Sequence, residues 1–405
     1  MIEPEPVMVS PYNTLPNVLK EFHLPETITI YDSTLRDGEQ MPGVCFTPEQ
    51  KLQLACKLDA MGVPEIEAGF PAVSKTEQST IKTIANEGLK AKILVLSRLK
   101  QEDIDAARAV DADLVLLFIA SSPLHLQYKL HRSEHEIKQL VQESIEYALD
   151  HGITPSFSTE DSTRTPLPFL EELVTLAYEV GAERIGFTDT LGCATPQTID
   201  HIFRHMRRIV PTPFSAHLHN DFGLALANAL AALNAGATHL CTTINGWGER
   251  AGNVPLEQLV MTIQTLYDVS LGIDTSQLTE LSKMVAEFTH LPLSKMQPFT
   301  GENVFSHESG IHVAAMMQHP RTYEAIAPEN VGNTRHFIIG KHTGKHFIQQ
   351  ILRSNGYQAT EEQLSEITSQ IKQLGEQRGS LSEEELLKFV HQMMLTEEED
   401  AKNLS

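Results

Sequence analysis

The sequence predicts an α/β protein, a (β/α)8 TIM barrel followed by a smaller, mostly helical C-terminal module. Two observations carry this prediction. From residue 27 onward, short apolar β-branched segments alternate with amphipathic ones, and eight such pairs fit within about 240 residues, the usual size of this barrel. Polar and charged residues also follow the carboxyl ends of many predicted strands, where barrel enzymes place their active sites.

Eight segments are predicted strands because they are short, apolar and rich in β-branched residues, as strands buried on both faces are. They span residues 28–32, 65–69, 93–97, 114–120, 154–159, 184–189, 214–219 and 239–245. An open doubly wound sheet is the alternative. It is disfavoured because no G-x-G-x-x-G follows a strand, and because the polar residues gather at many strand ends rather than at one switch point.

The predicted helices between the strands have recognisable ends. Cap-and-proline patterns such as TPEQ (47–50) begin them, and a glycine followed by an apolar residue ends several. Past about residue 295 the alternation stops, and helices are expected around 347–355, 361–375 and 382–395. We therefore divide the chain into an N-terminal extension (1–26), a catalytic barrel (27–294) and a C-terminal module (295–405), whose acidic tail (396–405) is expected to fray.

Composition narrows the kind of partner. The formal net charge of −22 disfavours nucleic acid and anionic membranes, which leaves a small molecule as the expected ligand. The four cysteines contain no C-x-x-C pair, so neither a disulfide framework nor a cysteine zinc site is expected. No signal peptide or membrane span is expected, and these features together predict a cytoplasmic protein.

Polar residues at the strand ends are the candidate functional groups. They are Arg36, Asp37 and Gln40 after the first strand, Glu160 and Asp161 after the fifth, Asp189 and Thr190 after the sixth, His217, His219, Asn220 and Asp221 at the seventh, and Asn245, Glu249, Arg250 and Asn253 after the eighth.

A metal site is the first hypothesis for this set. His217 and His219 lie two apart in a strand, so both imidazoles face the same side. With a carboxylate from a neighbouring strand they would form a two-histidine, one-carboxylate site with open positions. The first, seventh and eighth strands become neighbours when a barrel closes, which brings Asp37 and Asn253 toward this pair.

Each residue also has an ordinary structural interpretation. An H-x-H pair often forms only hydrogen bonds near a rim. Arg36 can serve as a structural ion-pair partner, and Glu160 can be an acid that favours a helix N-terminus. The convergence of several such groups favours the functional interpretation over these alternatives.

Six motifs in order, DSTLRDGEQ, EDSTRT, DTLGCATP, HLHND, NGWGERAGN and HESGIH, resemble the 2-isopropylmalate, homocitrate and citramalate synthases. These belong to the metal-dependent aldolase-like lyases and acyltransferases. The resemblance covers roughly residues 28–346 and is nearest to archaeal-type homocitrate synthases. It implies a barrel that holds a divalent cation (Mg²⁺, Mn²⁺ or Zn²⁺) and condenses acetyl-CoA with a 2-oxo acid, followed by thioester hydrolysis.

The resemblance also implies residue roles. Asp37, His217, His219 and Asn253 are expected metal ligands, Asn253 directly or through water, and Thr190 is expected to hold the substrate carboxylate. Gln40, from the strand-end set, is a further expected substrate-binding residue. Arg36 would stabilise charge on the keto oxygen and enolate, and Glu160 would be an acid/base. His312 and Tyr323 resemble residues that a domain-swapped homodimer supplies to the neighbouring subunit's site.

The expected substrate is 2-oxoglutarate, which makes homocitrate, with 2-isopropylmalate synthesis from 2-oxoisovalerate as the alternative. Phe70 stands where fungal-type homocitrate synthases have a histidine that binds the distal carboxylate, and an aromatic ring there suits an apolar substrate. His125, Lys129 or Arg98 would have to replace that histidine. More remote alternatives are a citramalate synthase, a carbon–carbon lyase like hydroxymethylglutaryl-CoA lyase, and a non-catalytic binding protein.

Overall fold

The computed structural model describes residues 8–20 and 22–403, which form two compact units. One unit spans Ser10–Leu293, and the other comprises residues from 294 onward together with residues 8 and 9. Residues 1–7, 21, 404 and 405, which include parts of the predicted N-terminal extension and tail, lie outside the described residues. Among the residues described, no helix is both long and apolar enough to cross a bilayer.

The larger unit is a closed barrel of parallel strands in sequence order, in which β1 pairs with both β2 and β8. In the described chain the strands are β1 (Thr29–Asp32), β2 (Glu65–Gly69), β3 (Lys92–Arg98), β4 (Leu114–Ala120), β5 (Pro155–Glu160), β6 (Arg184–Asp189), β7 (Phe214–Leu218) and β8 (His239–Thr242). The predicted fold class is therefore confirmed.

Strand β8 is three residues shorter than predicted. The chain turns at Asn245, which has a left-handed φ of 62°, and its side chain bonds to Ser282 on the last helix of the barrel rather than continuing the ladder. This turn directs the following loop over the mouth of the barrel, toward β7, where His219 and Asn253 form a bridge.

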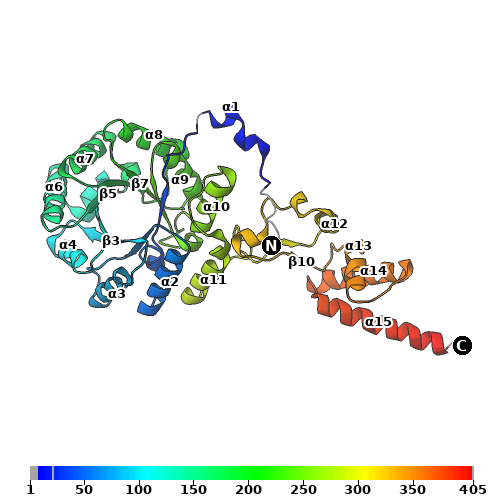
Figure 1. The fold of residues 1–405 in the computed structure, drawn as a ribbon. Coiled ribbons are helices and arrows are strands. Elements are labelled where there is room, and N and C mark those ends of the chain that lie inside the picture. The colour runs from blue at the N-terminus through cyan, green and yellow to red at the C-terminus, as the bar shows by residue number, and fades with distance from the viewer. Residues whose placement is uncertain (1–7, 21, 404–405) are drawn as a thin grey trace. The chain divides into compact units, whose positions relative to one another are not determined.

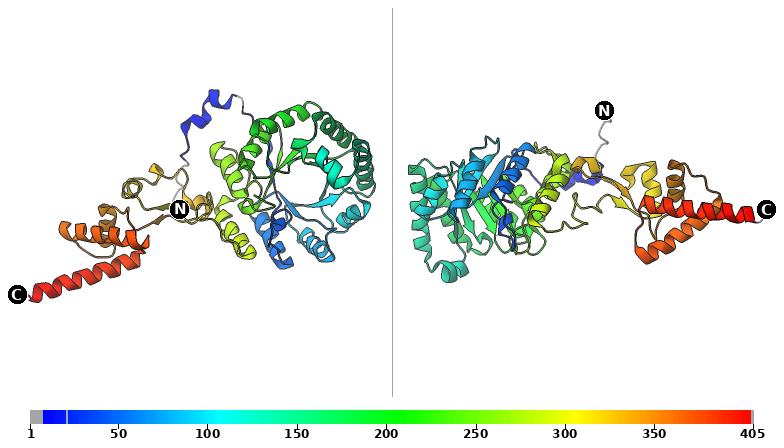
Figure 2. Two further views of the ribbon diagram at one scale, coloured as in Figure 1. Left: turned by 180° about the vertical axis from the view of Figure 1, so that it is seen from behind. Right: turned by 90° about the horizontal axis from the view of Figure 1, so that it is seen from below.

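Helices surround the strands (Figures 1 and 2). They are α2 (Pro48–Ala60), α3 (Lys75–Ala85), α4 (Gln101–Arg108), α5 (Pro123–His125), α6 (Glu134–Asp150), α7 (Leu167–Val180), α8 (Pro196–Arg207), α9 (Ala225–Asn234), α10 (Leu256–Leu266) and α11 (Leu278–Thr289), with the short α1 (Pro16–Leu19) before the barrel. A π-helical turn, Leu126–Leu130, follows α5. The cap-and-proline start predicted at Thr47 does begin α2, and Thr47 and Gln50 also form a capping box in which each satisfies the other's backbone N–H group.

Strand β7, which carries His217, packs against an aromatic cluster on its outer face. Phe214 of β7, Phe187 of β6 and Phe203 of α8 meet edge to face, with ring centroids 4.9 to 6.2 Å apart. Alternation then points Ser215 and His217 toward the barrel axis. Farther from the carboxyl ends of the strands, Arg184 donates to Glu65 at 2.7 Å. The interior of the barrel therefore also contains an ion pair.

The C-terminal unit is mostly helical, as predicted. It contains β9 (Ser306–His307), α12 (Gly310–Gln318), β10 (His336–Phe337), α13 (Lys345–Ser354), α14 (Glu361–Arg378) and α15 (Glu383–Asn403). Its core gathers apolar residues from α12 to α15, including Val313, Ile348, Ile367 and Leu386. Helix α15 continues through most of the predicted acidic tail, to Asn403, and the expected fraying of that tail stays a prediction.

Candidate active site

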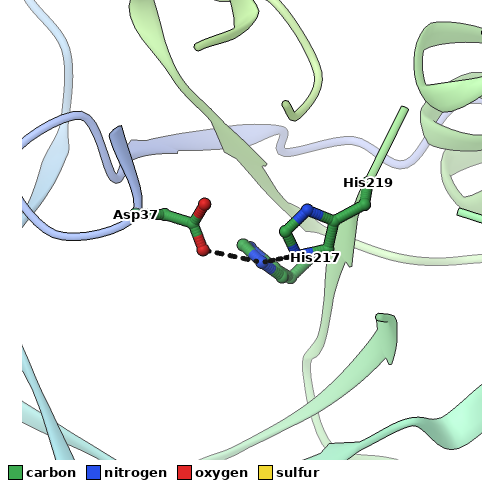
Figure 3. Close-up of side chains that lie close together, drawn as sticks. All are labelled: Asp37, His217 and His219. Carbon is green, nitrogen blue, oxygen red and sulfur yellow. Dashed lines mark hydrogen bonds and ion pairs between the residues drawn. The ribbon is translucent and has the colours of Figure 1, made fainter. Parts of the chain in front are cut away.

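Asp37, His217 and His219 meet at the carboxyl end of the barrel. His217 Nε2 lies 3.2 Å from His219 Nε2 and 3.5 Å from Asp37 Oδ2. Figure 3 shows the His217 imidazole between the carboxylate of Asp37 and the ring of His219, with an interaction drawn to each. One ligand atom from each residue lies within 4.8 Å of the others, as a metal site requires. The sequence-predicted convergence of these three residues is thus present.

The protonation of this cluster suits a cation. Burial, followed by the neighbouring His217, lowers the pKa of His219 to about 3, so His219 is neutral and offers a lone pair near pH 7. Burial alone would raise the pKa of Asp37, but Arg36 and His217 hold it well below its usual range. An anionic carboxylate and a neutral imidazole are the forms that bind metal.

Asn253 completes the arrangement. Its amide Nδ2 donates to Asp37 Oδ1 at 2.8 Å, while its buried Oδ1 has no hydrogen-bond partner in the described structure. An unpaired buried carbonyl oxygen costs free energy, and the two imidazole nitrogens, 3.2 Å apart, can bond to each other only if one of them carries the proton; with both unprotonated, their two lone pairs face each other. A cation held by these residues would relieve both costs, so the site fits a divalent metal with mixed nitrogen and oxygen ligands.

Arg36 lies beside the cluster in a fixed orientation. Its Nη1 donates to Asp37 Oδ2 at 2.6 Å, while Nε and Nη2 donate to the two oxygens of Glu67 at 2.9 and 3.0 Å. Burial would lower the pKa of Arg36, but Glu67 and Asp37 outweigh it and raise the pKa. The structural interpretation of Arg36 as an ion-pair partner therefore holds, but the pair lies inside the candidate site.

A cavity of about 360 Å³ opens above these groups. Its polar lining combines the metal cluster with residues from every side of the barrel mouth: Arg36, Gln40, Glu67, Lys129, Ser158, Glu160, Thr188, Thr190, Glu249 and Arg250. Leu96, Leu116 and Phe118 form an apolar wall contributed by β3 and β4. The cavity therefore offers charge at the metal side and apolar surface on another side.

Glu160 ends β5 and lines this cavity. Lys129 Nζ donates to both of its carboxylate oxygens, at 2.6 and 2.7 Å, and His125 Nδ1 lies 3.5 Å away. Only a three-residue 3-10 turn, Ser162–Arg164, follows Glu160 closely, and the next α-helix, α7, begins at Leu167. His125 contacts Glu160 and Asp161 but is not among the lining residues.

Thr190, another predicted substrate-binding residue, lines the cavity and is held by two hydrogen bonds. Its Oγ1 accepts from the N–H of Asp161 at 2.8 Å, and its carbonyl oxygen accepts from Arg250. Gln40 also lines the cavity, 3.5 Å from Arg36 Nη1.

Phe70 is not among the cavity-lining residues. The guanidinium of Arg98 lies over its ring at 5.5 Å, and Arg98 is itself bonded to Asp103. Of the three cations considered as replacements for a distal-carboxylate partner, Lys129 alone lines the cavity as described. The predicted assignment of Phe70 to substrate contact thus finds no support in the geometry.

His312 and Tyr323 lie in the C-terminal unit, where their rings stack with centroids 4.0 Å apart. Tyr323 is half-exposed, and Ile311, which precedes His312 in the chain, is largely exposed. The pair is thus assembled within its own unit and presented at that unit's surface.

Sequence reasoning missed Glu67, Ser158, Thr188 and the apolar wall. The signal for Glu67 was available, because Glu65 and Glu67 alternate in β2 and so face the same side of the strand. Two carboxylates that face the interior of a barrel require cationic partners, and Arg184 and Arg36 provide them.

Comparison with known proteins adds to this geometry. The HMGL-like family model matches residues 27–285, which is the barrel, and the model described as homocitrate synthase post-HMGL domain-like matches residues 299–379. The chain belongs to the HMGL-like family. The predicted resemblance is confirmed, and the second match falls within the C-terminal unit.

Several members of the HMGL-like family resemble this chain along most of its length. Homocitrate synthase AksA from Methanopyrus kandleri is 45% identical, over 96% of this chain and 97% of that protein. A probable 2-isopropylmalate synthase from the same organism is 46% identical, over 87% of this chain and 71% of that protein. Identity alone therefore does not separate the two activities.

A solved structure, the HMG-CoA lyase of Bacillus subtilis, superimposes with a TM-score of 0.61 at 21% identity, over 67% of this chain and 96% of that one. At this identity the likeness concerns the barrel fold alone.

Proposed function

We propose that this chain condenses acetyl-CoA with a 2-oxo acid and then hydrolyses the thioester, and that its principal substrate is 2-oxoglutarate, which yields homocitrate. The observation that carries the proposal is the meeting of Asp37, His217 and His219 with Arg36 in one cavity. The full-length similarity to homocitrate synthases supports the same reaction.

Asp37, His217, His219 and Asn253 would hold the divalent cation, Mg²⁺, Mn²⁺ or Zn²⁺. When bound, such a cation acts as a Lewis acid that polarises the keto group of the 2-oxo acid. Arg36 adds a fixed positive charge where the alkoxide oxygen develops, and because Glu67 already orients the guanidinium, no reorganisation is needed at that moment.

The acetyl methyl group is a weak acid, so its deprotonation needs a positioned base. Glu160 is the acid/base in this proposal. Two hydrogen bonds from Lys129 Nζ hold the carboxylate of Glu160 at the cavity. Thr190 and Gln40 would bind the 2-oxo acid, and His312 and Tyr323 would enter the site of the neighbouring subunit in a domain-swapped homodimer.

Two features bear on substrate choice. Lys129, whose Nζ also donates to both oxygens of Glu160, is the lining cation proposed to meet the distal carboxylate of 2-oxoglutarate with its third N–H. Phe70, which would have favoured an apolar substrate, is not part of the lining. The wall of Leu96, Leu116 and Phe118 would accept the branched alkyl group of 2-oxoisovalerate, which keeps 2-isopropylmalate synthesis as the second candidate.

The test is thiol release from acetyl-CoA in the presence of Mg²⁺ or Mn²⁺, with 2-oxoglutarate, 2-oxoisovalerate and pyruvate offered separately. A blank without oxo acid corrects for simple hydrolysis. We expect the highest kcat/KM with 2-oxoglutarate. A preference for 2-oxoisovalerate would assign 2-isopropylmalate synthesis instead, and no release with any of the three would refute the condensation.

A further inference from the structure

Arg250 connects three loops at the mouth of the barrel. It lies in the loop after β8 in a left-handed conformation with φ of 54°, which is uncommon for a residue with a side chain. Its Nε and Nη2 donate to the two oxygens of Asp221, in the loop after β7, at 2.8 and 3.0 Å. Nη2 also donates to the carbonyl oxygen of Thr190, in the loop after β6, at 2.5 Å.

The metal side of the site has a separate set of contacts. The N–H of Asn220 donates to the carbonyl of Gly252 at 2.9 Å, and His219 and Asn253 form a backbone bridge. Asn253 in turn donates to Asp37. These bonds join the loop after β8 to the metal ligands without using the guanidinium of Arg250.

The Thr190 loop, in contrast, is bonded to the guanidinium of Arg250 itself. Gly192, two residues beyond Thr190, packs so closely on the β7 loop that an added Cβ would lie 2.7 Å from the carbonyl oxygen of His219. Arg250 anchors the Thr190 carbonyl at this junction, and Asp221 fixes the direction of the guanidinium. Asp221 neutralises the charge of the Arg250 guanidinium. Arg250 therefore acts mainly by holding the Thr190 loop in place, and not by adding net positive charge to the site.

We propose that Arg250 is a positioning residue for 2-oxo acid binding: it fixes Thr190 relative to the metal ligands, while the metal ligands keep their own geometry without it. This inference rests on the proposed function, because it assigns Thr190 to the substrate. The inference predicts that loss of Arg250 changes affinity for the 2-oxo acid but not affinity for the metal. A residue that only stabilised the barrel mouth in general would change both affinities together.

The experiment compares Arg250→Gln and Arg250→Lys with the matched control Arg204→Gln. Arg204 also donates to both oxygens of an aspartate, Asp200, and to a backbone carbonyl, that of Asn234, but on α8 outside the cavity lining. Mn²⁺ affinity is measured by electron paramagnetic resonance. Binding of 2-oxoglutarate and 2-oxoisovalerate to the Mn²⁺-loaded protein is measured by calorimetry without acetyl-CoA, so no turnover is needed.

We expect Arg250→Gln to weaken binding of the preferred oxo acid by about tenfold or more, the size of one lost charge-assisted hydrogen bond. Mn²⁺ affinity should stay within about twofold. Arg250→Lys should recover part of the oxo acid affinity, since a lysine ammonium still offers a donor for the Thr190 carbonyl but lacks the fork that holds Asp221 at the same time. Asp221→Asn, which keeps the side-chain shape, should weaken oxo acid binding in the same direction.

Two results would overturn the inference alone. One is oxo acid affinity in Arg250→Gln equal to that of Arg204→Gln, and the other is an equal loss of Mn²⁺ affinity, which would make Arg250 part of the metal site. Wild-type protein that binds Mn²⁺ but neither oxo acid would overturn the proposed function and the inference together.

Discussion

Arg36 and Glu67 form a two-pronged ion pair inside the barrel, with Nε–Oε1 at 2.9 Å and Nη2–Oε2 at 3.0 Å. Ser33 donates to Glu67 Oε2 as well, and the Glu67 side chain is 1% exposed. The Glu67 carboxylate thus orients the Arg36 guanidinium. The remaining guanidinium nitrogen, Nη1, contacts the candidate metal ligand Asp37.

We expect Glu67→Gln to lower kcat/KM by about tenfold or more, because the amide cannot accept both guanidinium bonds and Arg36 loses its fixed direction. Steady-state kinetics checks this. The matched control is Glu65→Gln, on the same face of β2, whose partner Arg184 does not line the cavity; it should lower stability more than turnover. Near-wild-type kinetics for Glu67→Gln would contradict the role given to the Arg36–Glu67 pair.

We expect His217→Ala and Asp37→Ala each to abolish condensation and Mn²⁺ binding while the melting temperature changes little, because a partly open metal site is a minor part of a barrel's stability. Activity, Mn²⁺ titration and thermal melting are measured together. His205→Ala, on the outer helix α8 beside Glu171, serves as the control and should retain all three properties. Turnover that survives in either site variant would remove the metal assignment.

Subunit mixing tests the role of His312. If His312 acts in the neighbouring subunit's site, mixing inactive Arg36→Ala and His312→Ala subunits rebuilds one complete site in each heterodimer. Statistical mixing should then restore about a quarter of wild-type activity. Mixing Arg36→Ala with Asp37→Ala should restore none, because both substitutions damage the barrel. Heterodimers of the first pair that stay inactive would show that His312 does not act across subunits.

His239 makes a pH prediction possible. Burial, then Arg184 and Lys92, lowers its pKa to about 3 in the folded chain. Below its ordinary pKa of about 6.5 the unfolded chain takes up a proton that the folded chain does not, so this residue makes the free energy of unfolding fall as pH falls from about 6.5 toward 3.

Between pH 7 and pH 5 that loss amounts to about 2 kcal/mol for this group. Urea unfolding at the two pH values checks it. His239→Gln, which cannot titrate, should lose about 2 kcal/mol less than the wild type over the same interval. Equal losses in the two proteins would mean that His239 titrates normally in the folded chain.

Local sequence pattern determined most of the barrel. Continuous apolar segments between capped helices indicated every strand from β1 to β8. The spacing of His217 and His219 predicted that both imidazoles face the same side, since alternation along a strand is fixed by the backbone. The glycine-rich motif after β8 did not show where β8 ends, because the left-handed turn at Asn245 is stabilised by Ser282, 37 residues away.

Tertiary structure alone decided which side chains share the cavity. Asp37 and Asn253 are 216 residues apart and meet only because closure of the barrel sets β1 beside β8. The pairing of Arg36 with Glu67, the entry of Lys129 and the position of Phe70 beside Arg98 depend likewise on the stagger between neighbouring strands and on loop paths. Sequence determined the direction of each side chain on its own strand, whereas barrel closure determined what each one meets, because these contacts join segments with no local pattern in common.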